Sequence, residues 1–182
     1  LKNCYRQYRQ YSKAQTVLKN NLISLLDTVF PNANRLFSSP IRGDGSEKWV
    51  DFVAEFWHCR CVSEKSERAF TSKYLRWCRT HGYNFREAKA HTIYAEASGH
   101  IGVMPKSETT KLLVEQAVAQ LRATSTALAA LKHEMQSLAS MLPEYPVVMD
   151  LFGVGPTLDP QLIAEIGDVR RFYSKKALVA YA

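Results

Sequence analysis

The strongest constraint on the fold is an apolar repeat of seven residues between Ser107 and Leu142. One position of the repeat holds Val114, Leu121, Leu128, Met135 and Leu142, and the position three residues later holds Ala117, Thr124, Leu131 and Leu138. This spacing is typical of a coiled-coil helix. A helix of about 35 residues, at about 1.5 Å per residue, is roughly 50 Å long, which is too long for the core of a small domain. A second helix must therefore cover the apolar seam.

A candidate for that second helix is the segment from about Lys2 to Val29, which Pro31 ends. Its apolar residues share one side at about 100° per residue: Tyr11, Leu18, Leu22, Leu25, Leu26 and Val29. This helix can fold back as an intramolecular partner, or a second copy of the chain can supply the heptad helix, and the sequence leaves both open. Because nine seam positions form so long an apolar strip, we expect a homo-oligomer that associates through the coiled coil.

The opposite side of the first helix carries a row of cations: Lys2, Arg6, Arg9 and Lys13. No acidic residue precedes Asp27, and Tyr5 and Tyr8 flank the row. The whole chain has a net charge of +7 and a pI near 9.3, which suits a polyanionic partner. A solvated surface face is the plain alternative, but the tyrosines, which can stack on bases, favour nucleic-acid binding.

Residues 32–45 read as a connector rich in turn residues, and three short helices with an aromatic core follow. Asp44 with Glu47 resembles a capping box at the start of the first helix. We expect Ser63 to open the second helix, which Gly82 closes, and Asn84 to open the third, which Gly99 closes.

Four possible zinc ligands lie in this region: Cys59, Cys61, Cys78 and His81. Their spacing is poor, because Cys59 and Cys61 are two residues apart on an expected helix and would point to different faces. We therefore expect reduced, buried thiols and no metal site, with a zinc-stabilised adaptor as a weaker alternative.

No apolar stretch approaches the roughly 20 residues of a membrane span, and no leader opens the chain. We expect a soluble, intracellular protein with no membrane partner. The chain starts at Leu1 and stops inside a helix-like run, so we expect both ends to be cut ends.

The C-terminal region has the pattern of a helix-hairpin-helix, with an apolar Leu151-Phe-Gly-Val-Gly-Pro156 turn before a second apolar segment, 162–167. Glycines let a phosphate approach the backbone, and the first turn of the second helix can bind the anion. A plain interhelical turn is the alternative, which the nearby cations make less attractive. The predicted phosphate-binding residues are Gly153, Val154, Gly155 and Thr157, with Arg170, Arg171, Lys175 and Lys176 beside them.

The run from Phe152 to Ala182 resembles the opening of the C-terminal transposase domain of the insertion-sequence-110 family, the pilin-inverting transposases. Residues 6–31 resemble the segment that follows the first catalytic domain in that family, and the middle is similar only in layout. The Asp159-Pro160 pair departs from the small residues usual there and reads as an N-cap followed by a first-turn proline.

The resemblance implies an all-α region in four parts: a basic amphipathic helix (1–31), a helical insert (32–105), a coiled-coil helix (106–143) and the start of the C-terminal transposase domain (144–182). It also implies partners, namely DNA and a structured guide RNA, and a cytoplasmic, nucleoid-associated location in a bacterium or archaeon. The family acts through four carboxylates that bind a divalent metal in an N-terminal domain, and through a serine in a Ser-Gly motif. The resemblance places that serine after Ala182, so none of Ser98, Ser137, Ser140 and Ser174 inherits its role, although Gly99 follows Ser98. No acidic residue of this chain matches a metal-binding position of the carboxylate site.

We therefore assign no catalytic residue and no cofactor to this chain and expect it to be inactive alone. The favoured interpretation is the linker and nucleic-acid-binding region of a transposase, acting in DNA transposition. The alternative is a non-enzymatic helical protein, a DNA-binding or scaffold protein that shares the hairpin. A parent gene with upstream carboxylates and a downstream Ser-Gly motif would separate the two.

Overall fold

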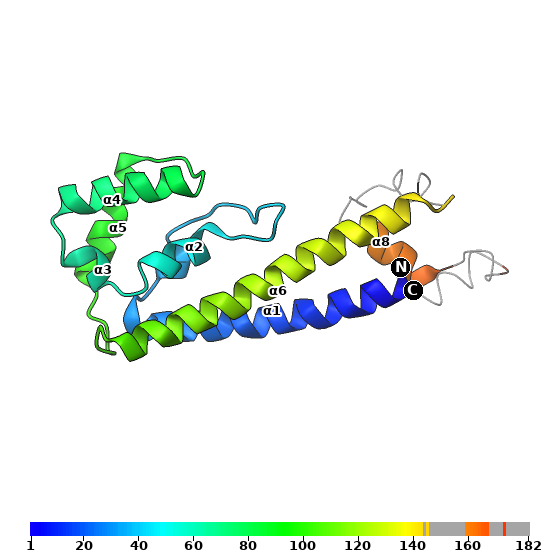
Figure 1. Ribbon diagram of the computed structural model, residues 1–182, viewed down its shortest axis with the longest axis horizontal. Coiled ribbons are helices and arrows are strands. Elements are labelled where there is room, and N and C mark those ends of the chain that lie inside the picture. The colour runs from blue at the N-terminus through cyan, green and yellow to red at the C-terminus, as the bar shows by residue number, and fades with distance from the viewer. Residues whose placement is uncertain (144, 146–158, 168–172, 174–182) are drawn as a thin grey trace. The chain divides into compact units, whose positions relative to one another are not determined.

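The computed structural model describes residues 1–143, 145, 159–167 and 173, and these residues form helices with no strand among them (Figure 1). The all-α prediction is confirmed. The chain divides into two compact units. Unit 1 consists of Leu1–Gln15 and Thr124–Ala182, and unit 2 is Thr16–Ala123.

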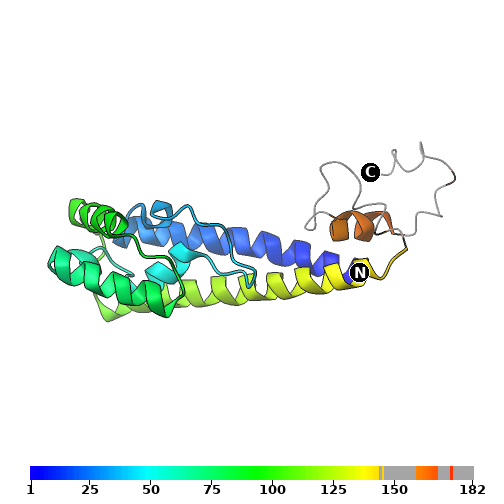
Figure 2. The same cartoon turned by 90° about the horizontal axis from the view of Figure 1, so that it is seen from above.

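Two long helices correspond to the two expected from sequence, α1 (Lys2–Val29) and α6 (Glu108–Ser140). Ser107 caps α6, since its hydroxyl accepts a hydrogen bond from the Thr110 N–H at 3.2 Å. Within each unit, the parts of α1 and α6 that belong to it lie side by side and antiparallel (Figures 1 and 2). In unit 1, the Gln15 side-chain amide donates to the Ser125 hydroxyl at 2.8 Å. Of the two partners that the sequence left open, α1 therefore covers α6.

The seam of α6 is partly as predicted. Val114, Leu121, Leu128 and Met135 are buried, whereas the positions three residues later are only half-buried, namely Ala117, Thr124, Leu131 and Leu138. The buried companions lie four residues later instead and include Val118, Ser125 and Ala139. At 3.6 residues per turn, a step of four rotates by about +40° and a step of three by about −60°. Helix α1 therefore covers the side of α6 that carries the residues four positions later. A strict heptad pattern predicts burial three positions later instead.

Unit 2 holds the insert, whose elements are η1 (Ala33–Arg35), α2 (Lys48–Glu55), α3 (Arg60–Ser63), α4 (Glu67–Thr80) and α5 (Glu87–Gly99). Its aromatic side chains form the core, as expected. Phe52 stacks on Phe56 with ring centroids 4.7 Å apart, and Tyr74 stacks on Trp77 at 5.7 Å. Apolar residues of α1 and α6 from the same unit complete this core, among them Leu22, Leu26, Val114 and Leu121.

Three predicted helix starts are wrong. The Asp44 carboxylate accepts from the Ser46 N–H at 2.9 Å and so forms a local turn, and α2 begins only at Lys48. Ser63 ends the short helix α3, while Ser66 caps α4 by accepting from the Ala69 N–H at 3.3 Å. Helix α5 begins at Glu87, after Arg86 rather than Asn84. Of these three helices only α4 has a side-chain cap, because neither Glu47 before α2 nor Arg86 before α5 makes a side-chain cap hydrogen bond.

Two buried polar side chains fix the loops of unit 2. Asp51 accepts from the Tyr83 hydroxyl at 2.6 Å and pairs with the Arg122 guanidinium at 2.7 Å, which ties α2 to α6. His58 is almost fully buried; its Nε2 lies 3.1 Å from the Met104 carbonyl oxygen, and its Nδ1 accepts from the backbone N–H of Arg60 at 3.1 Å. These two contacts of the His58 ring require its proton to be on Nε2.

In unit 1, helix α8 (Asp159–Ile166) ends at Gly167, which has a left-handed φ of 68° and donates to the Ile163 carbonyl at 2.9 Å. This helix matches the second helix expected for the hairpin. The first helix and the glycine turn lie outside the described residues. No helix in the described part of the chain is both long and apolar enough to cross a membrane.

Candidate nucleic-acid interface

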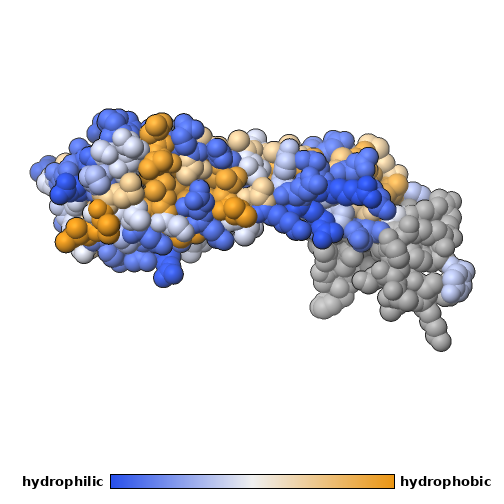
Figure 3. All heavy atoms as spheres, turned by 90° about the horizontal axis from the view of Figure 1, so that it is seen from below, coloured by the Kyte–Doolittle hydropathy of each residue, from blue (hydrophilic) through white to orange (hydrophobic). Residues whose placement is uncertain are grey.

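The predicted row of cations lies on one face of α1, in the part that belongs to unit 1. Lys2, Arg6, Arg9 and Lys13 are all exposed, and hydrophilic side chains gather over this half of the helix (Figure 3). From Lys2 to Lys13 the helix advances roughly 16 Å, so the row is long enough to follow several phosphates of a nucleic-acid backbone.

No carboxylate among the described residues neutralises the charge of this row. Within residues 1–143, none of the four cations forms an ion pair with a carboxylate. The Arg9 guanidinium lies 5.9 Å from the centroid of the Tyr5 ring, and both Tyr5 and Tyr8 are half-buried. An exposed, unpaired row of this kind can bind phosphates without removing existing partners.

The rest of the predicted site cannot be compared with the structure. Gly153, Val154, Gly155 and Thr157 of the hairpin lie outside the described residues. The same holds for the four C-terminal cations, which are Arg170, Arg171, Lys175 and Lys176.

The possible zinc ligands are not brought together as a site. Cys59 and Cys78 are buried and Cys61 is half-buried, with all of them in the thiol form. His81 Nδ1 lies 3.0 Å from the Trp77 carbonyl oxygen. Among the residues that the structure describes, no group of three or more His, Cys, Asp and Glu side chains is placed to hold a metal ion.

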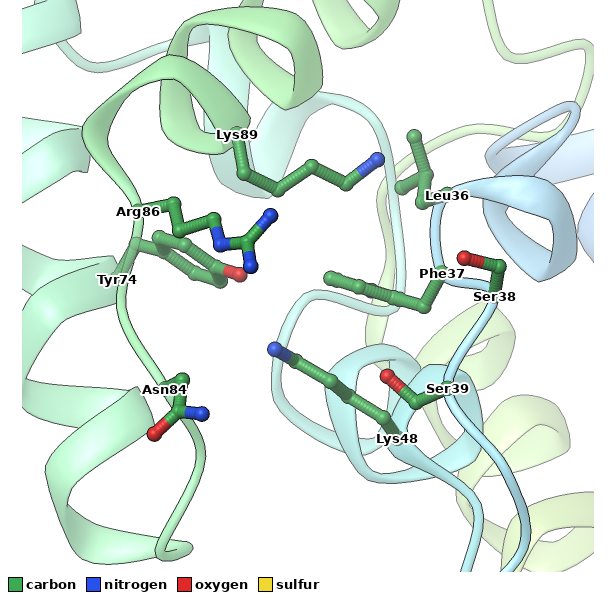
Figure 4. A pocket seen from close by; sticks show the side chains of 9 residues that line it. All are labelled: Leu36, Phe37, Ser38, Ser39, Lys48, Tyr74, Asn84, Arg86 and Lys89. Carbon is green, nitrogen blue, oxygen red and sulfur yellow. The ribbon is translucent and has the colours of Figure 1, made fainter.

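Sequence analysis missed a second group of cations, in the insert. Lys48 of α2 lines one pocket of unit 2 together with Arg86 and Lys89 at the start of α5 (Figure 4). Phe37, from the loop after η1, lies between the two lysines. These residues come from three distant segments, so no local spacing signals them.

Comparison with known proteins gives one match, at the C-terminal end. No curated protein and no solved structure matches the chain significantly. Residues 145–182 match the family described as Transposase IS116/IS110/IS902 family, over about a fifth of the 182 residues. This segment is therefore similar to transposases of insertion sequences, which agrees at the level of the family with the resemblance found in its sequence.

Proposed function

We propose that this chain is the nucleic-acid-binding and dimerising region of an insertion-sequence DNA transposase of the pilin-inverting type. The observation that carries the binding role is the exposed row of four cations on α1, which has no carboxylate partner in the described part of the chain. The family match at residues 145–182 supports the role in transposition.

The chemistry of the row favours the nucleic-acid backbone over the bases. Lysine and arginine side chains that contact phosphates fix the position of a protein on the strand but do not read its sequence. The half-buried rings of Tyr5 and Tyr8 sit beside the cations, where they can contact sugars or unstacked bases. The glycine turn 153–157 and its neighbouring cations would add a second backbone contact.

Salt titration tests the contribution of the row. We expect the chain to bind duplex DNA with little sequence preference, and the logarithm of the affinity to fall linearly with the logarithm of the salt concentration. Replacing Arg6 and Arg9 with alanine should lower the magnitude of that slope by about two, since each phosphate contact contributes about 0.9.

A matched control for that variant is the replacement of Arg76 and Arg79 with alanine. Both residues are exposed cations on α4, so this control removes the same charge from another surface. An equal change of slope in both double variants, or salt-independent binding, would show that the row is ordinary solvated surface.

The glycine turn requires a different substitution. Gly155→Val should weaken binding, because a side chain blocks the approach of a phosphate to the backbone, while the salt slope stays nearly constant. Wild-type affinity in this variant would indicate a plain interhelical turn.

For dimerisation, the supporting feature is a second apolar strip that α1 leaves uncovered on α6. In unit 2, a hollow of about 290 Å³ is lined by the apolar Leu18, Leu25, Leu113 and Ala117 together with the polar Asn21, Gln116 and Gln120, and apolar surface is visible on this unit (Figure 3). The half-buried Leu131 and Leu138 continue the heptad position of Ala117. A helix with apolar residues on two adjacent sides packs against two neighbouring helices. For α6 one neighbour is α1, and a second copy of the chain can supply the other neighbour.

Light scattering should then detect a dimer or a larger species. Leu113 is 46% exposed and lines the hollow, so Leu113→Lys should shift the chain towards monomer. The control is Leu112→Lys, at a neighbouring residue that is 54% exposed and does not line the hollow. A wild-type chain that stays monomeric at all concentrations would contradict the proposal.

A further inference from the structure

The insert contains a pocket whose lining is basic and aromatic. It has a volume of about 390 Å³, in the range of about 300–1,000 Å³ typical of small-molecule sites. The residues that define its character are Phe37, Lys48, Tyr74, Arg86 and Lys89, and no aspartate or glutamate is among the described residues that line it. Figure 4 shows the ends of Lys48, Arg86 and Lys89 turned towards the same hollow.

The three cations lack acidic partners. None of them forms an ion pair with a carboxylate in the described ranges. The Phe37 ring contacts two of them, with the Lys48 ammonium 5.0 Å and the Lys89 ammonium 5.5 Å from its centroid. Burial lowers the pKa of Lys48; the nearby Cys78 thiol opposes this effect, while the charges of Lys89, Arg42 and Arg86 add to it. An anion in the pocket would relieve this repulsion.

Arg42 strengthens the positive field from outside the lining. Its guanidinium lies 3.9 Å from the centroid of the Tyr83 ring and donates to the carbonyl oxygens of His81 and Gly82 at 2.9 and 3.0 Å. These contacts hold its charge in place. Asp44, an exposed carboxylate of the same loop, interacts with it electrostatically.

Uncharged donors complete the pocket. Helix α5 has 13 residues, and no side chain caps its first turn, where Arg86 and Lys89 lie. The positive end of a helix dipole and its free N–H groups favour an anion. The Tyr74 hydroxyl, at the pocket wall, is fully buried; it interacts with the Cys78 thiol but has no nitrogen or oxygen hydrogen-bond partner among the described residues. Glu87 is also in the first turn, but it is exposed and does not line the pocket.

We propose that this pocket is a phosphate-binding site that takes a phosphate monoester, with Lys48, Arg86 and Lys89 as its charged ligands. A dianion neutralises two of the three positive charges, and its several oxygens can accept from the cations and from the first turn of α5 at once. Phe37 offers an aromatic surface beside the phosphate position, which a nucleotide base can contact. The site is separate from the cation row on α1 and does not depend on it.

Calorimetric titration of the whole chain with inorganic phosphate, adenosine monophosphate and adenosine tests the proposal. Phosphate and the nucleotide should bind, and adenosine should not, because it lacks the anion. A nucleotide that binds at least about tenfold tighter than phosphate identifies a nucleotide site, while equal affinities identify a site for free phosphate. Adenosine that binds as tightly as the nucleotide, or no binding of either phosphate compound, would overturn the proposal.

Substitutions locate the binding. Lys48→Gln and Lys89→Gln should each weaken nucleotide binding by about tenfold, because each removes a charged ligand. Both should leave the unliganded chain as stable as wild type or more stable, since they remove uncompensated charge. Arg76→Gln on α4 removes an exposed cation outside the pocket and should change neither property.

Unchanged affinity in both pocket variants, or equal weakening in Arg76→Gln, would overturn the assignment. The variant with Arg6 and Arg9 replaced by alanine should keep full nucleotide affinity. A failure of DNA binding by α1 is therefore distinguishable from a failure of this site.

Discussion

At the scale of single residues, Gly102 shows how closely the loop before α6 packs against the rest of unit 2. A Cβ at this position would lie 2.9 Å from both Cε1 and Nε2 of His58 and 3.1 Å from the Val29 carbonyl oxygen. The His58 ring cannot easily move aside, because Met104 and Arg60 contact its two nitrogens. The absence of a side chain at Gly102 is thus a requirement of tertiary packing, with no left-handed backbone involved.

Gly102→Ala should therefore lower the free energy of unfolding by about 1–3 kcal/mol, the usual cost of overfilling a packed site. Gly99→Ala is the matched control: a Cβ there meets nothing within 4 Å, and its φ is not positive. That variant should be as stable as wild type or slightly more stable, because alanine reduces the entropy of the unfolded chain. Urea unfolding of the two variants would measure the difference, and equal stabilities would show that the His58 contact can relax.

At the scale of elements, the pairing of α1 with α6 includes a polar contact in an apolar seam. Ser125 is buried at a seam position, and its hydroxyl accepts from the Gln15 amide in unit 1. Buried polar residues in coiled coils favour one register at some cost in stability. We infer that this pair limits sliding of the two helices.

A double-mutant cycle tests that inference. Ser125→Val alone should change stability little, because the gain in apolar burial is offset by the unpaired amide of the half-buried Gln15. Gln15→Met alone should also change stability little, because it leaves the buried Ser125 hydroxyl unpaired, whereas the double variant should raise the free energy of unfolding by about 1 kcal/mol, so the two substitutions are coupled. Strict additivity in thermal or urea unfolding would mean that the hydrogen bond contributes nothing.

At the scale of the whole molecule, burial of several weak acids predicts sensitivity to alkaline pH. Burial raises the pKa of the Cys61 and Cys78 thiols and of the Tyr74 and Tyr83 phenols. Above the ordinary values of 9.0 for a thiol and 10.0 for a phenol, the unfolded chain releases protons that the folded chain keeps. The free energy of unfolding must then fall as pH rises through this range.

Lys48 acts in the opposite direction. Its pKa is lowered from 10.5, so between the lowered value and 10.5 the unfolded chain binds a proton that the folded chain lacks, which favours folding as pH rises. Four acids outweigh this single lysine, and we expect the urea midpoint to fall between about pH 8 and 11. The three tryptophans, Trp49, Trp57 and Trp77, all lie in unit 2, so their fluorescence follows the unit that contains these groups.

Tyr74→Phe removes one buried acid whose hydroxyl has no nitrogen or oxygen partner. The variant should show a shallower fall of the midpoint with pH while keeping wild-type stability at pH 7. A midpoint that stays constant up to pH 11 in the wild type would contradict the argument.

Local patterns in the sequence were sufficient to predict the two long helices and the cation row of the candidate site. The helical period of 3.6 residues places Lys2, Arg6, Arg9 and Lys13 on one face wherever α1 packs, and Pro31 ends the helix through its own geometry. Likewise, the seven-residue repeat predicted that Val114, Leu121, Leu128 and Met135 face a partner. These features depend on residues within a few turns of one another.

Only the tertiary structure decided which helix covers that seam and on which side. The repeat fits an intramolecular or an intermolecular partner equally well, and the burial of Val118 and Ser125 in place of Ala117 and Thr124 follows from where α1 lies. The starts of α2, α4 and α5 also escaped prediction, because α2 and α5 begin without a side-chain cap and α4 is capped by Ser66 instead of Ser63. The basic pocket required the fold as well: Phe37, Lys48 and Lys89 come from separate segments, and only the packing of those segments brings their charges and ring to one place.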